Sequence, residues 1–525
     1  MNYIFTNGFV LNSQTQNFEE KSVLIHNDRI ALIGNLQECK MQAKSSYEII
    51  NLKNRLLLPA FLDAHTHFVE YAKGRILVNL DGCHTIDEIR NYLISYRDNL
   101  SWKLKWILGG GWDRNCLNNP DELSLKLLDT IFPDIPVALM SKDYHSKLCN
   151  SLALKIAGIC KDTANPKGGL IEHNSIGELT GVLYESANEL IDPYIVYPES
   201  EVIIQAISET VDSIYPLGLV GFNSMESIFS RDLMLKTQEK RKKFRFCWHF
   251  YPEDYEKVLQ EGIKSYEGNE FYKLGGLKLF GDGSLGSQTA AMFESYPQGE
   301  KGILRYTDDE LFSLVLSAAE NGLSSTIHSI GNRCVKQVID CFLRLKKTGK
   351  HNTLFNRIEH IQAIRNEDIP LLKSSGLFAS LQPVHIANDI PLINKYWSDI
   401  KEQTYSIKSL ISTGIEYAFG SDAPIETINP FLGIYSAIER RQNNNPKNPQ
   451  FRPEQSINPF EAIWGYTMGA AKSTKSEHKR GSIETGKLAD LIVIEDFRQY
   501  PSTFWLTAKS ELTMINGDIV YVNEG

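Results

Sequence analysis

The sequence contains neither a long hydrophobic run nor a block of like charges. No window approaches the roughly 20 apolar residues that a membrane-spanning helix needs. The N-terminal MNYIFTNGFVLNS lacks the basic region and long apolar stretch of a signal peptide. The net charge of −9 is spread along the 525 residues, and the one basic run, 240–243, precedes an apolar segment, as the end of a solvated helix does. We therefore expect neither a membrane nor a nucleic acid as a partner.

Paired cysteine motifs are also absent. The eight cysteines are scattered without any CxxC pair, and Cys83, Cys149 and Cys334 have no partner pattern, which favours buried thiols. In a large chain without a signal peptide, this usage predicts reduced thiols and a cytoplasmic location. We find no internal repeat, and the polar stretch 443–449 is typical of a surface loop.

Strand-like segments occupy both ends of the chain. The first 58 residues and the last 45 contain short β-branched runs separated by Asn-Gly, Asn-Asp and Gly turns. Chain termini often lie close together, so the two segments can form one small β-sandwich. We expect this sandwich from residues 1–58 and 481–525, with 59–480 as a separate domain between them.

The central region alternates short apolar runs with longer amphipathic stretches, which indicates parallel strands and helices. A (β/α)8 barrel needs roughly 250 residues, which this chain accommodates. The predicted fold class is therefore α/β, a TIM-like (β/α)8 barrel with a small β-sandwich domain, and an insertion at about 75–215 fills the long gap after the first strand. The predicted strands are 58–67, 217–225, 244–250, 274–283, 323–330, 356–362, 376–384 and 416–422.

Six polar groups lie near the C-terminal ends of five of these strands. His65 and His67 alternate on the first strand and so project to the same side, and imidazole is a common ligand of zinc-like ions. Alone, such a pair is more often satisfied by hydrogen bonds, and a strand lysine is more often paired or partly exposed. Barrel active sites are built at this end of the strands, so the combination favours a metal site. The other members are Lys278 on strand four, His328 on strand five, His360 on strand six and Asp422 on strand eight.

These motifs resemble those of the amidohydrolase superfamily. PAFLDAHTH, the strand-four lysine, the histidines of strands five and six and GSDAP carry the likeness. GGGWDRN, NSLAL, GELTGVLYE, GGLKLFGDGSLGSQTA, HSIGNR, RIEHIQ, LQPVH and GSIETGKLADLIVI are similar to the branch typified by N-substituted formamide deformylase, the YtcJ-like branch. The resemblance spans nearly the whole chain. It implies a β-sandwich with a distorted barrel, hydrolysis of a carbon–nitrogen bond, and a homodimer.

The resemblance also implies a ligand set for two divalent metal ions. The chemistry agrees, because an ammonium group between two cations would be repelled, whereas a neutral amine can take up carbon dioxide and become anionic. We expect zinc, although the ligand types also suit iron, manganese or nickel. Two ions would activate a water and polarise the scissile carbonyl, and Asp422 could pass the proton of that water to the leaving amine. The implied ligands are His65, His67 and Asp422 for one ion, His328 and His360 for the other, and a carbamate on Lys278 as the bridge.

The strand-five motif departs from this branch. Its usual form, HxIGDR, has an acidic residue where this chain has Asn332. The departure puts in doubt a contact beside the metal ligands or with the substrate.

Further residues are candidates for contacting the substrate. Trp112 and Asp113 follow three glycines, which allow a tight turn and a close approach to a ligand; a purely structural turn is an equal alternative. His145 and His385 could orient a carbonyl or a leaving group, or be ordinary buried histidines. The substrate-binding candidates are Trp112, Asp113, His145 and Gln382, and His385 joins Asp422 and Lys278 as a catalytic candidate.

Two other functions fit parts of the pattern. A mononuclear aminohydrolase acting on a purine or similar ring typically has a glutamate three residues after the strand-five histidine, where this chain has Gly331. A non-catalytic barrel would have lost its ligands, whereas all six groups are present. The sequence therefore favours a metal-dependent hydrolase of a small-molecule amide. The insertion aromatics Trp102, Trp106, Trp112 and Tyr144 favour an apolar or aromatic substituent on it.

Overall fold

The computed structural model describes residues 2–43, 46–100, 103–142, 146–167, 169–240, 242–297, 299–350 and 354–524. Internal contacts separate two compact units, residues 1–68 with 210–525 and residues 69–209. The second unit covers most of the insertion expected at about 75–215. His145, Trp102 and Tyr144, which the sequence singled out, lie outside the described residues.

Eight parallel strands form the central sheet of the first unit, and each coincides with a predicted strand. Strands that follow one another in this unit are neighbours in the sheet, as in a TIM-like barrel. The sheet is nearly closed, because Thr66 and Ala423 form a further parallel bridge and the N–H of Asp422 donates to the carbonyl of His65 at 2.7 Å. In order, the strands are β8 (Phe61–Thr66), β15 (Leu219–Glu226), β16 (Arg245–Phe250), β17 (Tyr272–Phe280), β18 (Ser324–Ser329), β19 (Arg357–His360), β20 (Phe378–Leu381) and β21 (Tyr417–Phe419).

Amphipathic helices alternate with these strands, as the sequence predicts. The first turn of α9 is fixed by a capping box, in which Thr307 and Glu310 satisfy each other's backbone N–H groups. Helix α10 buries an apolar stripe that includes Val335, Val338 and Phe342. The main helices are α7 (Ile228–Glu239), α8 (Tyr255–Glu261), α9 (Asp308–Glu320), α10 (Asn332–Lys347), α11 (Ile369–Ser375), α12 (Ile386–Tyr396), α13 (Ile407–Ser412), α14 (Pro430–Glu439) and α15 (Pro459–Trp464).

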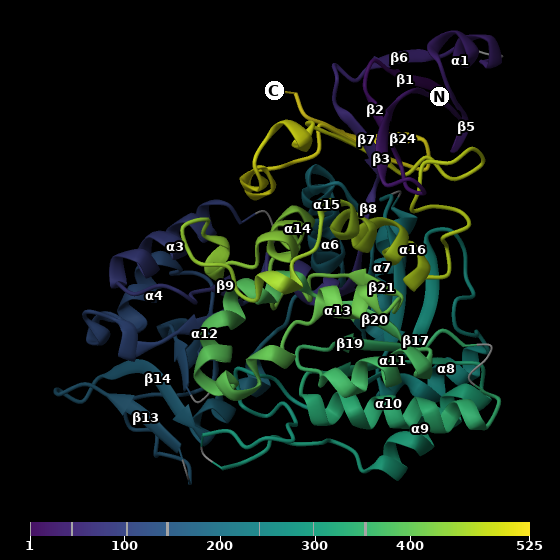
Figure 1. Ribbon diagram of the computed structural model, residues 1–525. Coiled ribbons are helices and arrows are strands. Elements are labelled where there is room, and N and C mark those ends of the chain that lie inside the picture. Colours follow the sequence, from purple (N-terminus) through teal and green to yellow (C-terminus); the bar gives the residue numbers. More distant parts are fainter. Residues whose placement is uncertain are drawn as a thin grey trace. The chain divides into compact units, whose positions relative to one another are not determined.

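The two ends of the chain share one six-stranded sheet, ordered β24-β23-β22-β7-β2-β3 (Figure 1). β7 pairs parallel with β2 and antiparallel with β22, so it joins the N-terminal and C-terminal strands. A four-stranded sheet, β5-β4-β1-β6, shares its hydrophobic core, to which Phe5 and Val23 contribute from one sheet and Leu57 and Leu491 from the other. The strands are β1 (Tyr3–Thr6), β2 (Phe9–Asn12), β3 (Asn17–Glu20), β4 (Ser22–His26), β5 (Arg29–Gly34), β6 (Glu48–Asn51), β7 (Leu56–Pro59), β22 (Leu491–Ile494), β23 (Leu512–Ile515) and β24 (Asp518–Val522).

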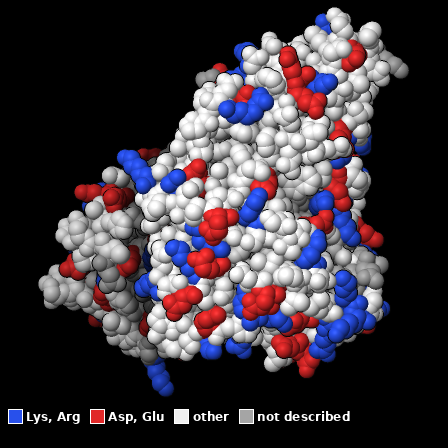
Figure 2. All heavy atoms as spheres, viewed as in Figure 1, with Lys and Arg blue, Asp and Glu red and all other residues white. Residues whose placement is uncertain are grey.

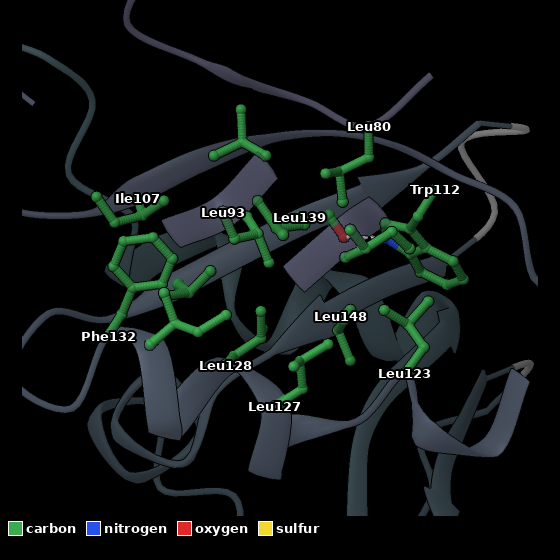
Figure 3. Close-up of a cluster of buried hydrophobic side chains, with 14 of the residues drawn as sticks. Leu80, Leu93, Ile107, Trp112, Leu123, Leu127, Leu128, Phe132, Leu139 and Leu148 are labelled. Atoms are coloured by element: carbon green, nitrogen blue, oxygen red, sulfur yellow. Dashed lines mark hydrogen bonds between the residues drawn. The ribbon is translucent and has the colours of Figure 1, made fainter. Parts of the chain in front are cut away.

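The second unit has a six-stranded sheet of its own, ordered β13-β14-β12-β11-β10-β9. Trp112 packs in the core on one face of this sheet and donates its indole N–H to the carbonyl of Leu139 at 2.8 Å (Figure 3). The three glycines before it lie within strand β10 rather than in a turn. A Cβ on Gly110 would lie 2.2 Å from the carbonyl oxygen of Met140, so glycine is needed for strand contact. The elements are β9 (Val78–Asn79), α3 (Ile86–Asp98), β10 (Ile107–Trp112), α4 (Leu125–Ile131), β11 (Val137–Ser141), β12 (Ser146–Cys149), α5 (Ser151–Ile156), β13 (Gly169–His173) and β14 (Leu179–Glu185).

Acidic and basic side chains are interspersed over the face shown in Figure 2. Across the described ranges, no helix is long and apolar enough to cross a bilayer. All eight cysteines are free thiols; Cys149 and Cys334 are buried and Cys83 is half-buried.

Candidate active site and metal centre

His65 and His67 lie at the end of β8, where hydrogen bonds from neighbouring segments fix the backbone. The N–H of His65 donates to Oδ1 of Asp63 at 2.9 Å, and the same carboxylate accepts the N–H of Ser421. A Cβ on Gly420 would lie 2.5 Å from the nitrogen of His65, so the last strand approaches the first closely only because position 420 is glycine. Barrel closure therefore brings the segment that carries Asp422 against the HxH motif.

Three of the predicted ligands converge into one buried cluster. One donor atom from each of His65, His360 and Asp422 lies within 4.8 Å of the other two. His360 and Asp422 both have left-handed backbones, with φ of 74° and 62°. Such a backbone costs a residue with a side chain roughly 1–3 kcal/mol and is concentrated at functional sites. The fold thus holds these two side chains in place at an energetic cost.

Hydrogen bonds occupy one ring nitrogen of each histidine and leave the other free. Nδ1 of His65 contacts Oε2 of Glu359 at 2.5 Å, and Nδ1 of His360 contacts Oε1 of Gln382 at 2.8 Å. Nδ1 of His67 contacts the carbonyl of Met225 at 3.1 Å. Because carboxylate and carbonyl oxygens only accept, each Nδ1 carries the proton and each Nε2 has a free lone pair. This tautomer is the one that a metal-binding histidine needs.

The free nitrogens of the HxH motif face the carboxylate of Asp422. Nε2 of His65 and Nε2 of His67 each lie 3.4 Å from Oδ1 of Asp422, and Nε2 of His65 is buried without a hydrogen-bond partner in the described chain. An unpartnered buried nitrogen beside a carboxylate is costly unless a further group occupies the site. A divalent cation fits these donors.

His328 extends the cluster through a ring contact with His360. The two rings meet edge to face, with centroids 4.6 Å apart, and His360 also contacts the ring of His65 at 4.9 Å. Nε2 of His328 donates to the carbonyl of Gly283 at 3.1 Å, so Nδ1 is the nitrogen left for a ligand. Asp282 lies 3.5 Å from the same Nε2 but is committed to the backbone N–H groups of Ala291, Ile330 and Gly331.

Lys278 is fully buried on β17, and its Nζ has no hydrogen-bond partner among the described residues. Burial lowers the pKa of this amine to about 8. Burial and the charge of Lys278 also lower the pKa of His65 to about 4 and that of His328 to about 3, so both rings are neutral at pH 7. Neutral imidazoles beside an amine that readily loses its proton suit a metal or a carbamate better than an ion pair.

The sequence pattern of the amidohydrolase family matches residues 48–521. The chain belongs to the amidohydrolase family. The Bacillus subtilis protein YtcJ is 30% identical over 99% of both chains, and the N-substituted formamide deformylase of Arthrobacter pascens is 22% identical over 90% of both. The family resemblance indicated by the motifs is thereby confirmed. Among solved structures, an uncharacterized metal-dependent hydrolase from Pyrococcus furiosus has a TM-score of 0.76 and 24% identity, covering 94% of this chain and 99% of its own.

The other candidate residues of this amidohydrolase are divided between the two units. Nε2 of His385 lies 3.5 Å from Oδ2 of Asp422. Gln382 is buried and contacts His360, and its amide nitrogen lies 3.3 Å from the carbonyl of Ser380. Trp112 belongs to the core of the second unit, and Asp113 follows it and accepts a weak hydrogen bond from Cys116. Substrate binding by these residues stays a prediction.

The structure also reveals two residues at this site that the sequence analysis did not use. Glu359 orients His65, and Arg357 holds Glu359 through hydrogen bonds of 2.9 and 3.1 Å. Although burial acts in the opposite direction, Arg357 and His65 hold the pKa of Glu359 well below its usual range. The sequence did contain a signal for this pair. In RIEH, two opposite charges alternate along a predicted strand and so project to the same side, and in the structure all four residues of this strand are buried.

Proposed function

We propose that this amidohydrolase cleaves the carbon–nitrogen bond of an N-formyl or N-acyl amine, using a divalent metal at the mouth of its barrel. The observation that carries the proposal is the buried cluster of His65, His360 and Asp422, whose donors lie within 4.8 Å while the Nδ1 atoms of both histidines are already engaged. Histidines oriented in this way are typical metal ligands.

The remaining predicted ligands extend this cluster to two metal ions. His67 adds a nitrogen on the side of His65, and His328 adds one on the side of His360. Lys278, a buried amine with a lowered pKa, would become an anionic ligand as a carbamate. We expect zinc, with iron, manganese and nickel as alternatives. A divalent cation held by these residues polarises a carbonyl and makes water more acidic.

Asp422 is the residue that we expect to move the proton. Burial would raise its pKa, but the hydrogen bond from His385 holds the pKa well below its usual range. The carboxylate is therefore ionised at neutral pH and can accept a proton from the attacking water. Once protonated, it can deliver that proton to the departing nitrogen, which leaves poorly as an anion.

Two observations bear on the alternatives. The position where a ring deaminase has its glutamate is Gly331, which has no side chain, and the nearby carboxylate of Asp282 is committed to backbone N–H groups. Glu359 and Gln382 hold His65 and His360 in the tautomer with the proton on Nδ1, which leaves Nε2 free for a metal. A non-catalytic scaffold would not need this arrangement. The name of the Arthrobacter relative, a deformylase of N-substituted formamides, supports a small-molecule amide.

Metal analysis combined with a substrate panel tests the proposal. Purified protein is analysed for zinc, iron, manganese and nickel and then assayed with N-formyl and N-acetyl derivatives of alkyl and benzyl amines. We expect one or two metal ions per chain and release of the free amine, which a chelator abolishes and added metal restores. Release of ammonia from purine or pyrimidine rings with no amide cleavage would favour a deaminase. A metal-replete protein inactive on every compound would favour the scaffold.

A further inference from the structure

Arg357 is a fully buried arginine on β19, in the interior of the barrel. Its guanidinium contacts both carboxylate oxygens of Glu359, at 2.9 and 3.1 Å, and donates to Oδ1 of Asn223 at 2.7 Å and to the carbonyl of Ala64 at 2.6 Å. One side chain therefore connects strands β19, β15 and β8.

Two of these contacts lead to the same residue. The carbonyl of Ala64 belongs to the peptide that precedes His65, and Glu359 accepts the Nδ1 proton of His65 at 2.5 Å. On the other side of that peptide, the N–H of His65 is bound by Asp63. The backbone and the ring of His65 are thus both restrained, and Arg357 takes part in both restraints.

We infer that Arg357, acting through Glu359, is a positioning residue that fixes the orientation of His65 for metal binding. An imidazole ring can flip by about 180°, and in only one orientation does Nδ1 reach an acceptor while Nε2 points into the site. Glu359 selects that orientation and Arg357 holds Glu359 in place. This inference rests on the proposed metal-dependent function and assigns a task within it to two residues that are not themselves ligands.

A purely structural role makes a different prediction. Removing one partner of a buried ion pair leaves the other charge buried and unpaired, so a purely structural pair would lower stability without changing metal affinity. Partners of metal-bound histidines, in contrast, typically change metal affinity by about 10–100-fold when they are replaced. Metal affinity therefore separates positioning from packing.

The chain contains a matched control in Arg245. This arginine also forms a two-pronged buried pair, with Asp490 at 2.8 and 2.7 Å, and both side chains are 4% exposed. Its described hydrogen bonds go to Asp490, Asn516 and the carbonyl of Glu270, none of which is an expected metal ligand. Replacing it removes a comparable ion pair without disturbing His65.

The experiment compares the wild type with Glu359→Gln, Arg357→Met, Arg357→Lys and Arg245→Met. For each protein, zinc affinity is measured by competition with a chelator, the visible spectrum is recorded after cobalt loading, and the Tm of the metal-free protein is measured by circular dichroism. We expect Glu359→Gln and Arg357→Met to weaken zinc binding by about 10–100-fold and to shift the cobalt bands. Arg357→Lys should recover part of the affinity, because it keeps a cation but loses the planar fork. Arg245→Met should lower Tm and leave affinity and spectrum unchanged.

The inference is overturned if the variants lower Tm as Arg245→Met does while zinc affinity and the cobalt spectrum stay those of the wild type. Glu359→Gln, which preserves shape, decides the question if Arg357→Met fails to fold. A wild-type protein that binds no divalent metal would refute the proposed function itself, and the wild-type measurement alone would reveal this. Wild-type binding with unaffected variants would refute only the role of Arg357.

Discussion

Oδ2 of Asp422 lies 3.5 Å from Nε2 of His385, while Oδ1 of the same carboxylate lies 3.4 Å from Nε2 of both His65 and His67. The two oxygens therefore face different partners. One can bind a metal together with the HxH motif, and the other can exchange a proton with His385. In the proposed function, this division would let a single residue act as both ligand and proton carrier.

Asp422→Asn should separate these two tasks. Asparagine keeps one ligating oxygen but cannot take up a proton. We expect most of the metal to be retained and kcat to fall by about 10²–10⁴-fold, the usual contribution of a general acid–base group. Steady-state kinetics on metal-analysed protein provide the test, with His385→Ala as the comparison. A near-normal kcat in Asp422→Asn with a collapse in His385→Ala would assign the proton transfer to the histidine.

Lys278→Ala should abolish most of the activity by removing the bridging ligand. Because the substitution leaves a cavity, added short carboxylates such as acetate should restore part of the rate. Carbon-13 NMR of the wild type with labelled bicarbonate should show a carbamate signal that Lys278→Ala lacks. A fully metallated wild type with a free lysine amine would argue for a single metal.

His65→Ala should lose metal as well as activity. The substitution removes a ligand and leaves the buried carboxylate of Glu359 without one of its partners, so we also expect lower stability. Elemental analysis of folded protein measures the loss. Replacing the exposed His26 with alanine is the control and should leave metal content unchanged. Full turnover in metal-stripped wild type would contradict the metal-dependent function.

Position 332, where this chain has Asn instead of the Asp of the HxIGDR motif, should not tolerate aspartate. Its amide nitrogen donates to Glu294 and Gln403, at 2.8 Å each, and its oxygen accepts the N–H of Phe293 at 3.0 Å. Asn332→Asp removes both donors and places a second negative charge beside Glu294. We expect a loss of about 1–3 kcal/mol in the free energy of unfolding. Adding Glu294→Gln should recover part of it, which a double-mutant cycle by urea unfolding measures. Independent, additive effects would show that the two residues are not coupled.

Asp282 should make the metal-free protein less stable as the pH rises. Burial raises its pKa to about 7, although the N–H groups of Gly331, Ile330 and Ala291 act in the opposite direction. Between roughly pH 4 and pH 7 the folded protein keeps a proton that the unfolded chain has lost, so this group lowers the free energy of unfolding by at most about 1.4 kcal/mol per pH unit. Above about pH 7, Asp282 is ionised in both the folded and the unfolded protein, so it causes no further loss of stability.

Urea unfolding between pH 4 and pH 8 checks this. The stability of the wild type relative to Asp282→Asn should fall as the pH rises through the window and then stay constant. Asp87→Asn, at a side chain that is 90% exposed, is the control and should leave the pH profile unchanged. A constant difference between wild type and Asp282→Asn would show that Asp282 is ionised throughout.

The strands of the barrel could be predicted because each is a short apolar run that ends in polar or turn-forming residues. LGGLKLFGDG predicts a strand at 274–283, and the structure has it at Tyr272–Phe280. The polar end of that motif forms a loop instead, because Asp282 binds backbone N–H groups of the loop and of the next strand's end. The ligand candidates followed from residue type and from position at the strand ends.

Contacts between distant segments could not be predicted in this way. Glu359 is 294 residues from His65 in sequence, and only closure of the barrel brings them together. The glycines before Trp112 suggested a turn, yet they lie in strand β10, where a Cβ on any of them would clash with neighbouring backbone. A local pattern records which residues can approach closely but not which partner they approach.

Strand β7 lies between β2 and β22, so the six-stranded sheet can be completed only at the end of synthesis. A ribosome releases Leu56–Pro59 early, whereas the strand that covers its other edge, Leu491–Ile494, emerges only after the whole barrel has been made. Until then the early strands have an open edge, which is prone to pair with other chains. A nascent chain stalled before residue 491 should therefore depend on chaperones more than the finished protein does, and a missing C-terminus should cause aggregation before it causes loss of catalysis.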